Sequence, residues 1–206
     1  MGGDPMFTGI VQSVGEITSV DPMDQGVRLK ISAPGMDFGD VVLGDSICVS
    51  GACLTVVYLA APAFWVDVSA ETLRCTSGIE APGPVNLEKA MRLSDRLGGH
   101  LVSGHVDGVG TVTRFEAAGP SYALDIRAPH TLLKYIAPKG SVTVDGVSLT
   151  VNRVLKDEFS INLIPHTLAH TTLNRLCAGA TVNLEADMIA RYVERLTSAA
   201  EQPYQD

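Results

Sequence analysis

Two short runs, 95 residues apart, carry the small polar side chains best suited to do chemistry. Residues 51–56 read Gly-Ala-Cys-Leu-Thr-Val and residues 146–151 read Gly-Val-Ser-Leu-Thr-Val, so Cys53 matches Ser148. Because side chains alternate across a strand, each run predicts aliphatic residues on one face and thiol or hydroxyl groups on the other. Small polar groups on an outer face would suit a flat heterocycle with imide and hydroxyl groups. The alternative, that these residues only favour a solvated strand, has about equal support.

Histidine is the side chain best suited to act as a base near neutral pH, and two histidines fall within residues 98–105. His105 stands at a repeated Gly-x-Val where the first copy has Ile10, which indicates a role that only one copy performs. His100 follows two glycines, and we interpret it as a histidine bonded to the backbone of a turn. Zinc is not favoured, because the pair lacks a third ligand nearby and an adjacent acidic partner.

Lys139 marks another difference between the copies, because Gly44 occupies the matching position. No Ser-His-Asp or Cys-His triad can be assembled from spacing alone. The chain has no GxGxxG, no GxxxxGK[ST] and no DxDxDG motif. The sequence therefore supports no nucleotide-phosphate or calcium site, and we expect neither a metal nor a cofactor.

The same 95-residue offset relates the two halves of the chain over about 70 positions, from Gly9 and Gly104 to Thr72 and Thr167. A period this long indicates a duplicated domain rather than a solenoid. Each copy has six short runs rich in Val, Ile, Thr and Leu between turn residues, which predicts a small closed barrel or sandwich. The predicted strands are residues 9–17, 27–32, 46–49, 54–59, 64–68 and 85–88, then 104–112, 123–127, 142–144, 149–155, 159–163 and 182–185.

Composition excludes several classes of protein. The net charge is −8 with no Lys/Arg cluster, whereas a nucleic-acid partner would need a basic surface. No apolar run approaches the roughly 20 residues that span a bilayer, and no secretion signal is evident, so we expect a cytoplasmic protein without a membrane partner. The four cysteines form no CxxC pair and no symmetrical framework, which favours reduced thiols.

The chain divides into four predicted segments. Residues 1–5 precede a second methionine and have no match in the other copy, so we interpret them as a cloning remnant. We expect an N-terminal domain at 6–97, a C-terminal domain at 98–187 and a tail at 188–206, with 87–99 as the linker. Short helices are predicted in the Pro-Gly-containing stretch after Ile31, at residues 132–136, and near Leu73 and Leu168.

The tail predicts one amphipathic helix over residues 188–200. Asp187 stands at its N-cap position, and Arg191 follows at the spacing of a favourable charge pair. The apolar stripe must be covered by this chain's own domains or by the same helix in neighbouring subunits, and the residues alone favour neither. The stripe consists of Ile189, Tyr192, Val193, Leu196 and Ala200.

Four ordered motifs resemble the riboflavin synthase family, alpha chain. They are Met-Phe-Thr-Gly-Ile-Val-Gln at 6–12, the run at 51–56, Gly-Gly-His with Ser-Gly-His at 98–105, and Asp-Gly-Val-Ser-Leu-Thr-Val at 145–151. The resemblance covers essentially all of residues 6–196. It implies an all-β fold of two tandem six-stranded Greek-key β-barrels plus a C-terminal α-helix, and a homotrimer assembled through that helix.

The resemblance also implies a reaction, in which one molecule of 6,7-dimethyl-8-ribityllumazine gives a four-carbon unit to another. The products are riboflavin and 5-amino-6-ribitylamino-pyrimidinedione, with no metal or redox cofactor. One lumazine would sit on each barrel, and the working site would form between the N-terminal barrel of one subunit and the C-terminal barrel of another. Catalysis would rest mainly on proximity and orientation, with proton transfers.

The implied site residues follow from matching motifs. The N-terminal barrel would bind lumazine through Cys53, Leu54, Thr55, Asp67, Val68, Ser69, Ala70, Glu71 and Thr72, closed over by Gly104, His105, Val106 and Lys139. The C-terminal barrel would use Ser148, Leu149, Thr150, Asn162, Leu163, Ile164, Pro165, His166 and Thr167, closed over by Gly9, Ile10 and Val11. The residues tied to turnover are Phe7, Cys53, His105 and Ser148, with Ser46 and Asp187 as weaker candidates.

Within this set, we expect His105 to assist deprotonation of the 7-methyl group and Ser148 to orient the attacking oxygen or the second substrate. His166 departs from the acidic residue frequent at its position in the family. The rival interpretation is a lumazine-binding antenna protein without turnover, which would lose reactive residues in one barrel. A flavin-binding barrel of a reductase is a third, but it would need a following nucleotide-binding domain.

Overall fold

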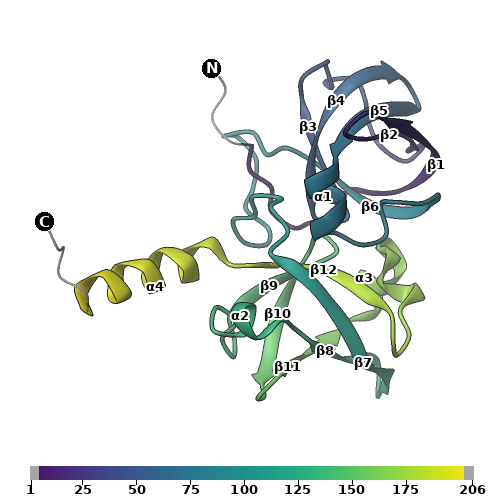
Figure 1. The fold of residues 1–206 in the computed structure, drawn as a ribbon. Coiled ribbons are helices and arrows are strands. Elements are labelled where there is room, and N and C mark those ends of the chain that lie inside the picture. The colour runs from purple at the N-terminus through teal and green to yellow at the C-terminus, as the bar shows by residue number, and fades with distance from the viewer. Residues whose placement is uncertain (1–4, 202–206) are drawn as a thin grey trace, which may run out of the picture.

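The computed structural model describes residues 5–201, which form two β-barrels and a C-terminal helix that extends away from them (Figure 1). The first barrel contains β1 (Ser13–Met23), β2 (Gly26–Ser32), β3 (Ser46–Val49), β4 (Ala52–Ala60), β5 (Ala63–Ser69) and β6 (Gly83–Lys89). The second contains β7 (Gly108–Ala118), β8 (Ser121–Arg127), β9 (Ser141–Val144), β10 (Val147–Val154), β11 (Glu158–Leu163) and β12 (Thr181–Ala186). The helices are α1 (Ala70–Cys75), α2 (His130–Leu133), α3 (Pro165–His170), the 3₁₀ turn η1 (Thr172–Arg175) and α4 (Met188–Glu201).

The strand order of both closed barrels is the same, β1-β2-β5-β4-β3-β6 in the first and β7-β8-β11-β10-β9-β12 in the second. Neighbouring strands pair antiparallel throughout both barrels. Three consecutive hairpin strands, with the next strand returning beside the first of them, make a Greek key. The predicted fold of two six-stranded barrels plus a tail helix is confirmed.

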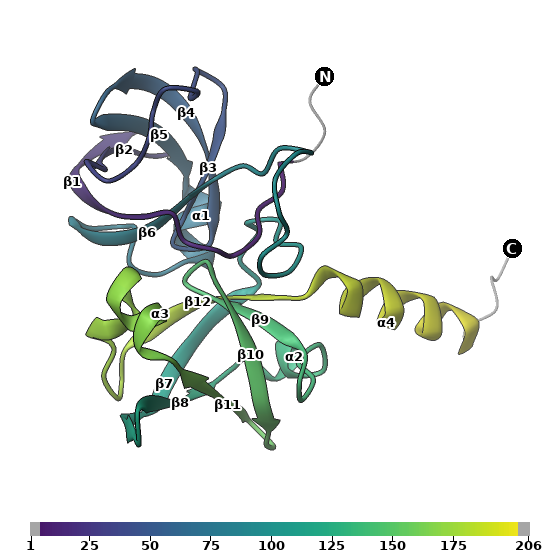
Figure 2. The same cartoon turned by 180° about the vertical axis from the view of Figure 1, so that it is seen from behind.

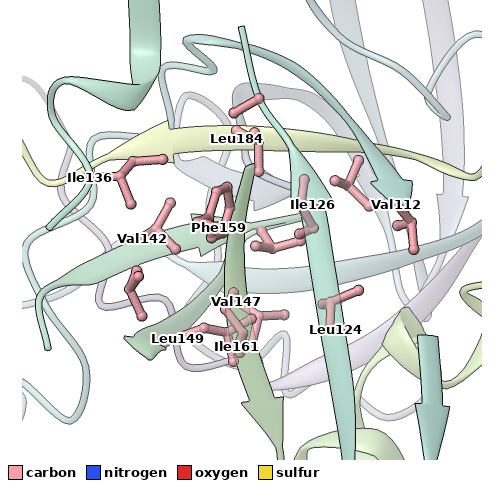
Figure 3. Close-up of a cluster of buried hydrophobic side chains, with 14 of the residues drawn as sticks. Val112, Leu124, Ile126, Ile136, Val142, Val147, Leu149, Phe159, Ile161 and Leu184 are labelled. Carbon is pink, nitrogen blue, oxygen red and sulfur yellow. The ribbon is translucent and has the colours of Figure 1, made fainter. Parts of the chain in front are cut away.

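Each barrel is filled by the aliphatic face of its strands. In β10 the residues alternate between buried and accessible, with Leu149 and Val151 in the core and Thr150 outside, as the period-two pattern predicts. Figure 3 shows side chains of this core converging from several strands around Phe159, which is fully buried. Phe64 has the corresponding place in the core of the first barrel.

The two barrels meet through symmetry-related turns and a short bridge. Phe7 and Val102 pair with each other in an isolated antiparallel bridge, and both side chains are fully buried. The turns before β4 and β10 approach so closely that a Cβ built on Gly51 would lie 3.2 Å from the backbone nitrogen of Gly146. The duplicated domains therefore form a continuous structure across a shared interface.

Asparagine side chains complete this interface in a crossed pattern. Asn86 Nδ2 donates to the carbonyl of Asp145 at 2.9 Å, and Asn183 Nδ2 donates to the carbonyl of Ser50 at 2.9 Å. Asp145 Oδ1 also accepts from the backbone N–H of Asn183 at 2.8 Å. Burial of the Asp145 carboxyl raises its pKa to about 7, although that N–H opposes the shift.

Several sequence expectations need correction. The first strand of each barrel starts at Ser13 and Gly108, four residues after the predicted starts, because the preceding residues cross to the other barrel. Part of the predicted linker is strand, since β6 continues to Lys89. The stretch after Ile31 contains turns and no helix, whereas the predicted short helices near 73 and 168 are present. The helix predicted at 132–136 begins and ends earlier, as α2 at His130–Leu133. Residues 1–4 of the predicted cloning remnant lie outside the described range.

The tail helix α4 points away from both barrels in the two opposite views of Figures 1 and 2. Asp187 Oδ1 accepts the N–H of Ile189 at 2.9 Å, which confirms the predicted cap. The expected pairing of Arg191 with Asp187 is wrong, because the guanidinium instead forms an ion pair with Asp107. The apolar stripe stays open, and Leu196 is 72% exposed. Among the described residues, no helix has the length and apolar character to cross a membrane.

Candidate functional site between the exchanged segments

The segments that precede β1 and β7 are exchanged between the barrels. The carbonyl of Gly9 accepts the backbone N–H of Ser148 at 2.8 Å, so the segment before the first barrel reaches a strand of the second. The carbonyl of Gly104 accepts the N–H of Cys53 at 2.8 Å, so the segment before the second barrel reaches a strand of the first. The two polar side chains singled out by the repeat therefore lie at equivalent junctions.

Both junctions require glycine. Gly9 and Gly104 have the same left-handed φ of 74°, a conformation that favours glycine. A Cβ on Gly9 would lie 2.6 Å from Ser148 Cβ, and one on Gly104 would lie 2.7 Å from Cys53 Cβ. These contacts are too short for any side chain, so the glycines let each segment press directly against the opposite strand.

A hollow of about 210 Å³ opens beside Cys53 on the first barrel. Its walls come from the start of β4, from α1 and its C-terminal end, and from the exchanged segment. The lining residues are Ala52, Cys53, Glu71, Thr72, Cys75, Thr76, Gly104, His105 and Val106. Six residues of the predicted N-terminal site are thus brought together from three separate parts of the chain.

The polar groups around this hollow are largely satisfied by neighbours. Ser69 caps α1 by accepting the N–H of Thr72 at 3.1 Å. Asp67 forms a two-point ion pair with Arg28, and the hydrogen bond lowers the pKa of that carboxyl. Hydrogen bonding to Arg74 lowers the pKa of Glu71 in the same way.

The remaining residues predicted for the N-terminal site divide by strand face. Leu54 and Val68 point into the barrel core, so only their backbone could meet a ligand. Thr55 is exposed on the outer face, and Ala70 begins α1. Lys139 is not among the residues that line the hollow.

Lys139 lies in the turn between α2 and β9, where its backbone N–H donates to the carbonyl of Val151 at 2.8 Å. Its φ is 68°, which is rare for a residue with a side chain, and Gly44 has a φ of 94° at the matching position. The exposed lysine therefore keeps a backbone conformation that glycine adopts in the other barrel.

On the second barrel, Ser148 has a histidine partner that sequence reasoning assigned wrongly. His100 Nδ1 lies 2.7 Å from Ser148 Oγ, and its Nε2 lies 3.4 Å from Thr143 Oγ1. The ring is thus bonded to two side chains and not to the backbone of a turn. Burial lowers the pKa of His100 and so favours the neutral ring, while the charge of Asp187 opposes the shift.

The sequence did contain a signal for this partner. Gly98, Gly99 and His100 stand in the segment that connects the two barrels, and the N–H of His100 donates to the carbonyl of Thr8 at 3.1 Å. This backbone bond to Thr8 holds the imidazole of His100 beside β10, the strand that carries Ser148. A histidine in a segment between two domains is therefore a stronger candidate for a site residue than its neighbours in the sequence indicate.

The rest of the predicted C-terminal site lies on β10, β11, α3 and the first exchanged segment. Leu149 and Leu163 are in the core, Thr150 and Ile164 are exposed, and Pro165 begins α3. The first exchanged segment contributes Ile10, which is exposed, and Val11, which packs against the core of the second barrel.

Two histidines occupy α3 where α1 of the first barrel has Glu71 and Cys75. The rings of His166 and His170 lie 4.1 Å apart between centroids, and His170 Nδ1 lies 2.8 Å from the carbonyl oxygen of His166. Thr167, one residue on, accepts a hydrogen bond at its carbonyl from Thr171 Oγ1 at 2.7 Å.

Elsewhere in the second barrel, Asn162 Nδ2 donates to Ser121 Oγ at 2.9 Å. Phe7 is fully buried with Cys48 and Val102 between the barrels, so its ring cannot touch a ligand in this chain. Within residues 5–201, no three His, Cys, Asp or Glu side chains are grouped to hold a metal ion.

Comparison with known proteins gives the family. The model of the lumazine binding domain matches residues 8–90 and again residues 103–187. The riboflavin synthase of Photobacterium phosphoreum is 45% identical over 93% of this chain and 88% of its own length. The riboflavin synthase of Bacillus subtilis is 42% identical over 96% and 92%, and that of Mycobacterium bovis is 45% identical over 95% and 100%.

Solved structures agree with the fold. LumP complexed with 6,7-dimethyl-8-(1'-D-ribityl) lumazine is 27% identical and superposes with a TM-score of 0.77. LumP complexed with riboflavin is 28% identical with a TM-score of 0.78, and each comparison covers 87% of this chain and 98% of LumP. The two barrels are thus two matches to the lumazine binding domain, and the chain belongs to the riboflavin synthase family.

Proposed function

We propose that the protein is a riboflavin synthase, which converts two molecules of 6,7-dimethyl-8-ribityllumazine into riboflavin and 5-amino-6-ribitylamino-pyrimidinedione. A four-carbon unit leaves one lumazine and joins the other, and the two products together contain all the atoms of the two substrates. The reaction therefore needs no external oxidant or reductant. The observation that carries the proposal is the duplicated junction, which presents Cys53 and Ser148 at equivalent positions.

Each barrel supplies part of the chemistry. We assign one lumazine to the hollow beside Cys53, where His105 is exposed and available to take a proton from an acidic methyl group. The second lumazine is assigned to the wall beside Ser148, whose hydroxyl is oriented by the neutral ring of His100. Most of the acceleration comes from holding the two substrates in reacting geometry.

The working site is assigned to two subunits of a cytoplasmic homotrimer. The exposed stripe of α4 supports assembly, because Ile189, Tyr192 and Leu196 are each more than half exposed in the single chain. Lys139 is exposed and lies outside the hollow of its own chain, and we assign it to a contact with the first barrel of a neighbour. Phe7 then acts through packing against the residues that support Cys53 and Gly104.

A mass measurement in solution tests the assembly. We expect the wild-type chain to run as a trimer at micromolar concentration and Leu196→Asp to run as a smaller species, because the charge would enter the covered stripe. Ser198→Asp, at an exposed position of the same helix outside the stripe, is the matched control. A wild-type monomer at that concentration would contradict the assembly.

A lumazine-binding antenna protein is the second candidate, supported by the likeness to LumP. The identity of 41–45% to several riboflavin synthases, against 27–28% to LumP, favours the enzyme. Incubation of the purified protein with the lumazine separates the two. The enzyme would yield riboflavin and the pyrimidinedione in equal amounts, whereas bound lumazine without product would leave the antenna function.

A further inference from the structure

Two buried carboxylates hold the exchanged segments. Glu88 Oε1 accepts the N–H of Thr8 at 2.8 Å and its hydroxyl at 2.6 Å, and Glu88 Oε2 accepts the N–H of Gly9 at 2.9 Å. Glu185 Oε1 accepts the N–H and the hydroxyl of Ser103, each at 2.7 Å, and Glu185 Oε2 accepts the N–H of Gly104 at 3.0 Å. Both glutamates are 4% exposed.

The sequence contains a signal for this pair outside the 95-residue frame. Residues 85–88 and 182–185 both read Val-Asn-Leu-Glu, and their offset is 97 residues. The shift of two residues hides the match from an alignment at the main period. The same tetrapeptide nevertheless closes both barrels, as β6 and β12.

The hydrogen bonds cross from one barrel to the other. Glu88 belongs to β6 of the first barrel, but the glycine that it holds bonds through its carbonyl to Ser148 of the second. Glu185 belongs to β12 of the second barrel and holds Gly104, whose carbonyl bonds to Cys53 of the first. Each carboxylate is thus two hydrogen bonds away from a site residue of the opposite barrel.

These contacts are strong enough to fix the segments. Hydrogen bonds to a carboxylate are roughly twice as strong as those between neutral groups, and each carboxylate accepts three. The crossing glycines have no Cβ to limit their backbone, so the carboxylates provide a constraint that the chain itself lacks. Loss of one acceptor would leave backbone donors buried and unpaired.

We propose that Glu88 is a positioning residue for the Ser148 side of the site and that Glu185 is a positioning residue for the Cys53 side. Each barrel thereby sets the geometry of the pocket on the other barrel. The effect on turnover rests on the proposed function, but the geometry can be read without turnover. If the carboxylates only stabilised the fold, loss of either one would disturb the Cys53 side and the Ser148 side equally. Alternatively, it would disturb only the barrel to which that carboxylate belongs.

The test compares Glu88→Gln and Glu185→Gln with Glu16→Gln, an exposed control on β1. Both oxygens of each glutamate accept a backbone N–H. In a glutamine variant the amide nitrogen replaces one of these oxygens and faces that N–H, so the exchanged segment must shift. The alkylation rate of Cys53 by iodoacetamide, followed by peptide mass spectrometry, reports the first barrel. The imidazole NMR signals of His100 report the second barrel.

We expect a crossed result. Glu185→Gln should change the Cys53 rate several-fold and move the His100 signals only slightly, whereas Glu88→Gln should move the His100 signals strongly and change the Cys53 rate only slightly. With the lumazine as substrate, each should lower kcat by about 10- to 100-fold, because small misplacement of reacting groups is costly. The control should change none of these quantities.

An uncrossed result, or equal changes on both sides, would overturn the proposal. If a glutamine variant does not fold, Thr8→Ala and Ser103→Ala each remove one hydrogen bond to the carboxylate, and Thr8→Ala also removes the bond from the N–H of Ile10. Both must show the same crossing at smaller size. A wild-type protein without synthase activity would remove the proposed function but would leave the Cys53 and His100 readouts as a separate test.

Discussion

In the first barrel Cys53 faces Gly104 and His105, whereas in the second barrel Ser148 faces Gly9 and Ile10. The backbone hydrogen bonds at the two junctions join equivalent positions, and both are 2.8 Å long. Gly9 and Gly104 also have the same φ of 74°. The side chains differ at three positions that would meet a ligand and could take part in chemistry, namely Cys53 against Ser148, His105 against Ile10, and Glu71 against His166. The common backbone provides two similar platforms, and the unlike side chains allow the two bound molecules to react in unequal roles.

The interface between the barrels shows a second difference of the same kind. Ser50 and Asp145 occupy matching turns, and each accepts the backbone N–H of the matching asparagine, at 3.1 and 2.8 Å. A neutral hydroxyl thus does in one barrel what a titratable carboxyl does in the other. The first difference concerns turnover, and this one concerns the dependence of stability on pH.

Ser148→Ala should have the largest effect on turnover. We expect kcat for riboflavin formation to fall by about 100-fold or more, because the hydroxyl that orients the reacting group is lost. Asn152→Ala, at an exposed position of the same strand outside the predicted site, is the control. An undiminished rate in Ser148→Ala would show that the second barrel does not use this hydroxyl.

His105→Ala should lower kcat by up to about 100-fold, as expected for loss of a group that takes a proton. The change makes the second exchanged segment more like the first, which has Ile10 at this position. Steady-state kinetics over pH 5–9 measures the effect. Full turnover in this variant would end the assignment of His105 as a base.

His100→Gln tests the partner of Ser148 and should have a smaller effect. The amide can still bond Ser148 Oγ but cannot accept a proton as imidazole does, so we expect kcat to fall by about 10-fold. His170→Gln, an exposed histidine on α3, serves for comparison. A rate equal to wild type would mean that His100 only packs.

Asp145→Asn should change stability with pH and have the smallest effect on turnover. The folded pKa of about 7 lies above the ordinary value of 3.8, so the folded protein binds this proton more tightly. The free energy that the bound proton of Asp145 adds to folding is therefore complete below about pH 4, and it is lost as pH rises through about 7. Asparagine keeps the acceptor for Asn183 and cannot ionise.

We therefore expect the Tm of Asp145→Asn minus that of wild type to increase by several degrees between pH 5 and pH 8. Thermal unfolding at each pH measures the difference. Glu88 and Glu185 also have pKa values raised by burial, but they titrate in both proteins and cancel in the difference. Parallel Tm curves would contradict a buried Asp145 proton.

Local signals were enough to predict two domains of six short strands each, as a barrel or a sandwich, and the family resemblance decided between the two in favour of barrels. Alternation of residues along β4 and β10 indicated the core faces correctly, including Leu54 inside and Thr55 outside. The repeat also pointed to Cys53 and Ser148 as equivalent positions. Period and spacing carry this information without any knowledge of distant contacts.

The crossing segments could not be predicted from local patterns, because their partners lie far away in the chain; only the family resemblance placed Gly9 over the second barrel and Gly104 over the first. Nothing near Gly9 indicates that it ends its path against Ser148, and its segment was therefore predicted as the start of a strand. His100 and Glu88 were misjudged or missed for the same reason, since their partners are 48 and 80 residues away. Only the folded chain brings these groups together.

The most direct test of one lumazine on each barrel is a binding titration of Ser148→Ala, in which slow turnover leaves the substrate intact. Lumazine fluorescence, checked by equilibrium dialysis, gives the number of molecules bound per chain at saturation. We predict two per chain, with the site on the second barrel weaker than the site on the first. Saturation at one per chain would contradict the claim that each barrel holds a substrate.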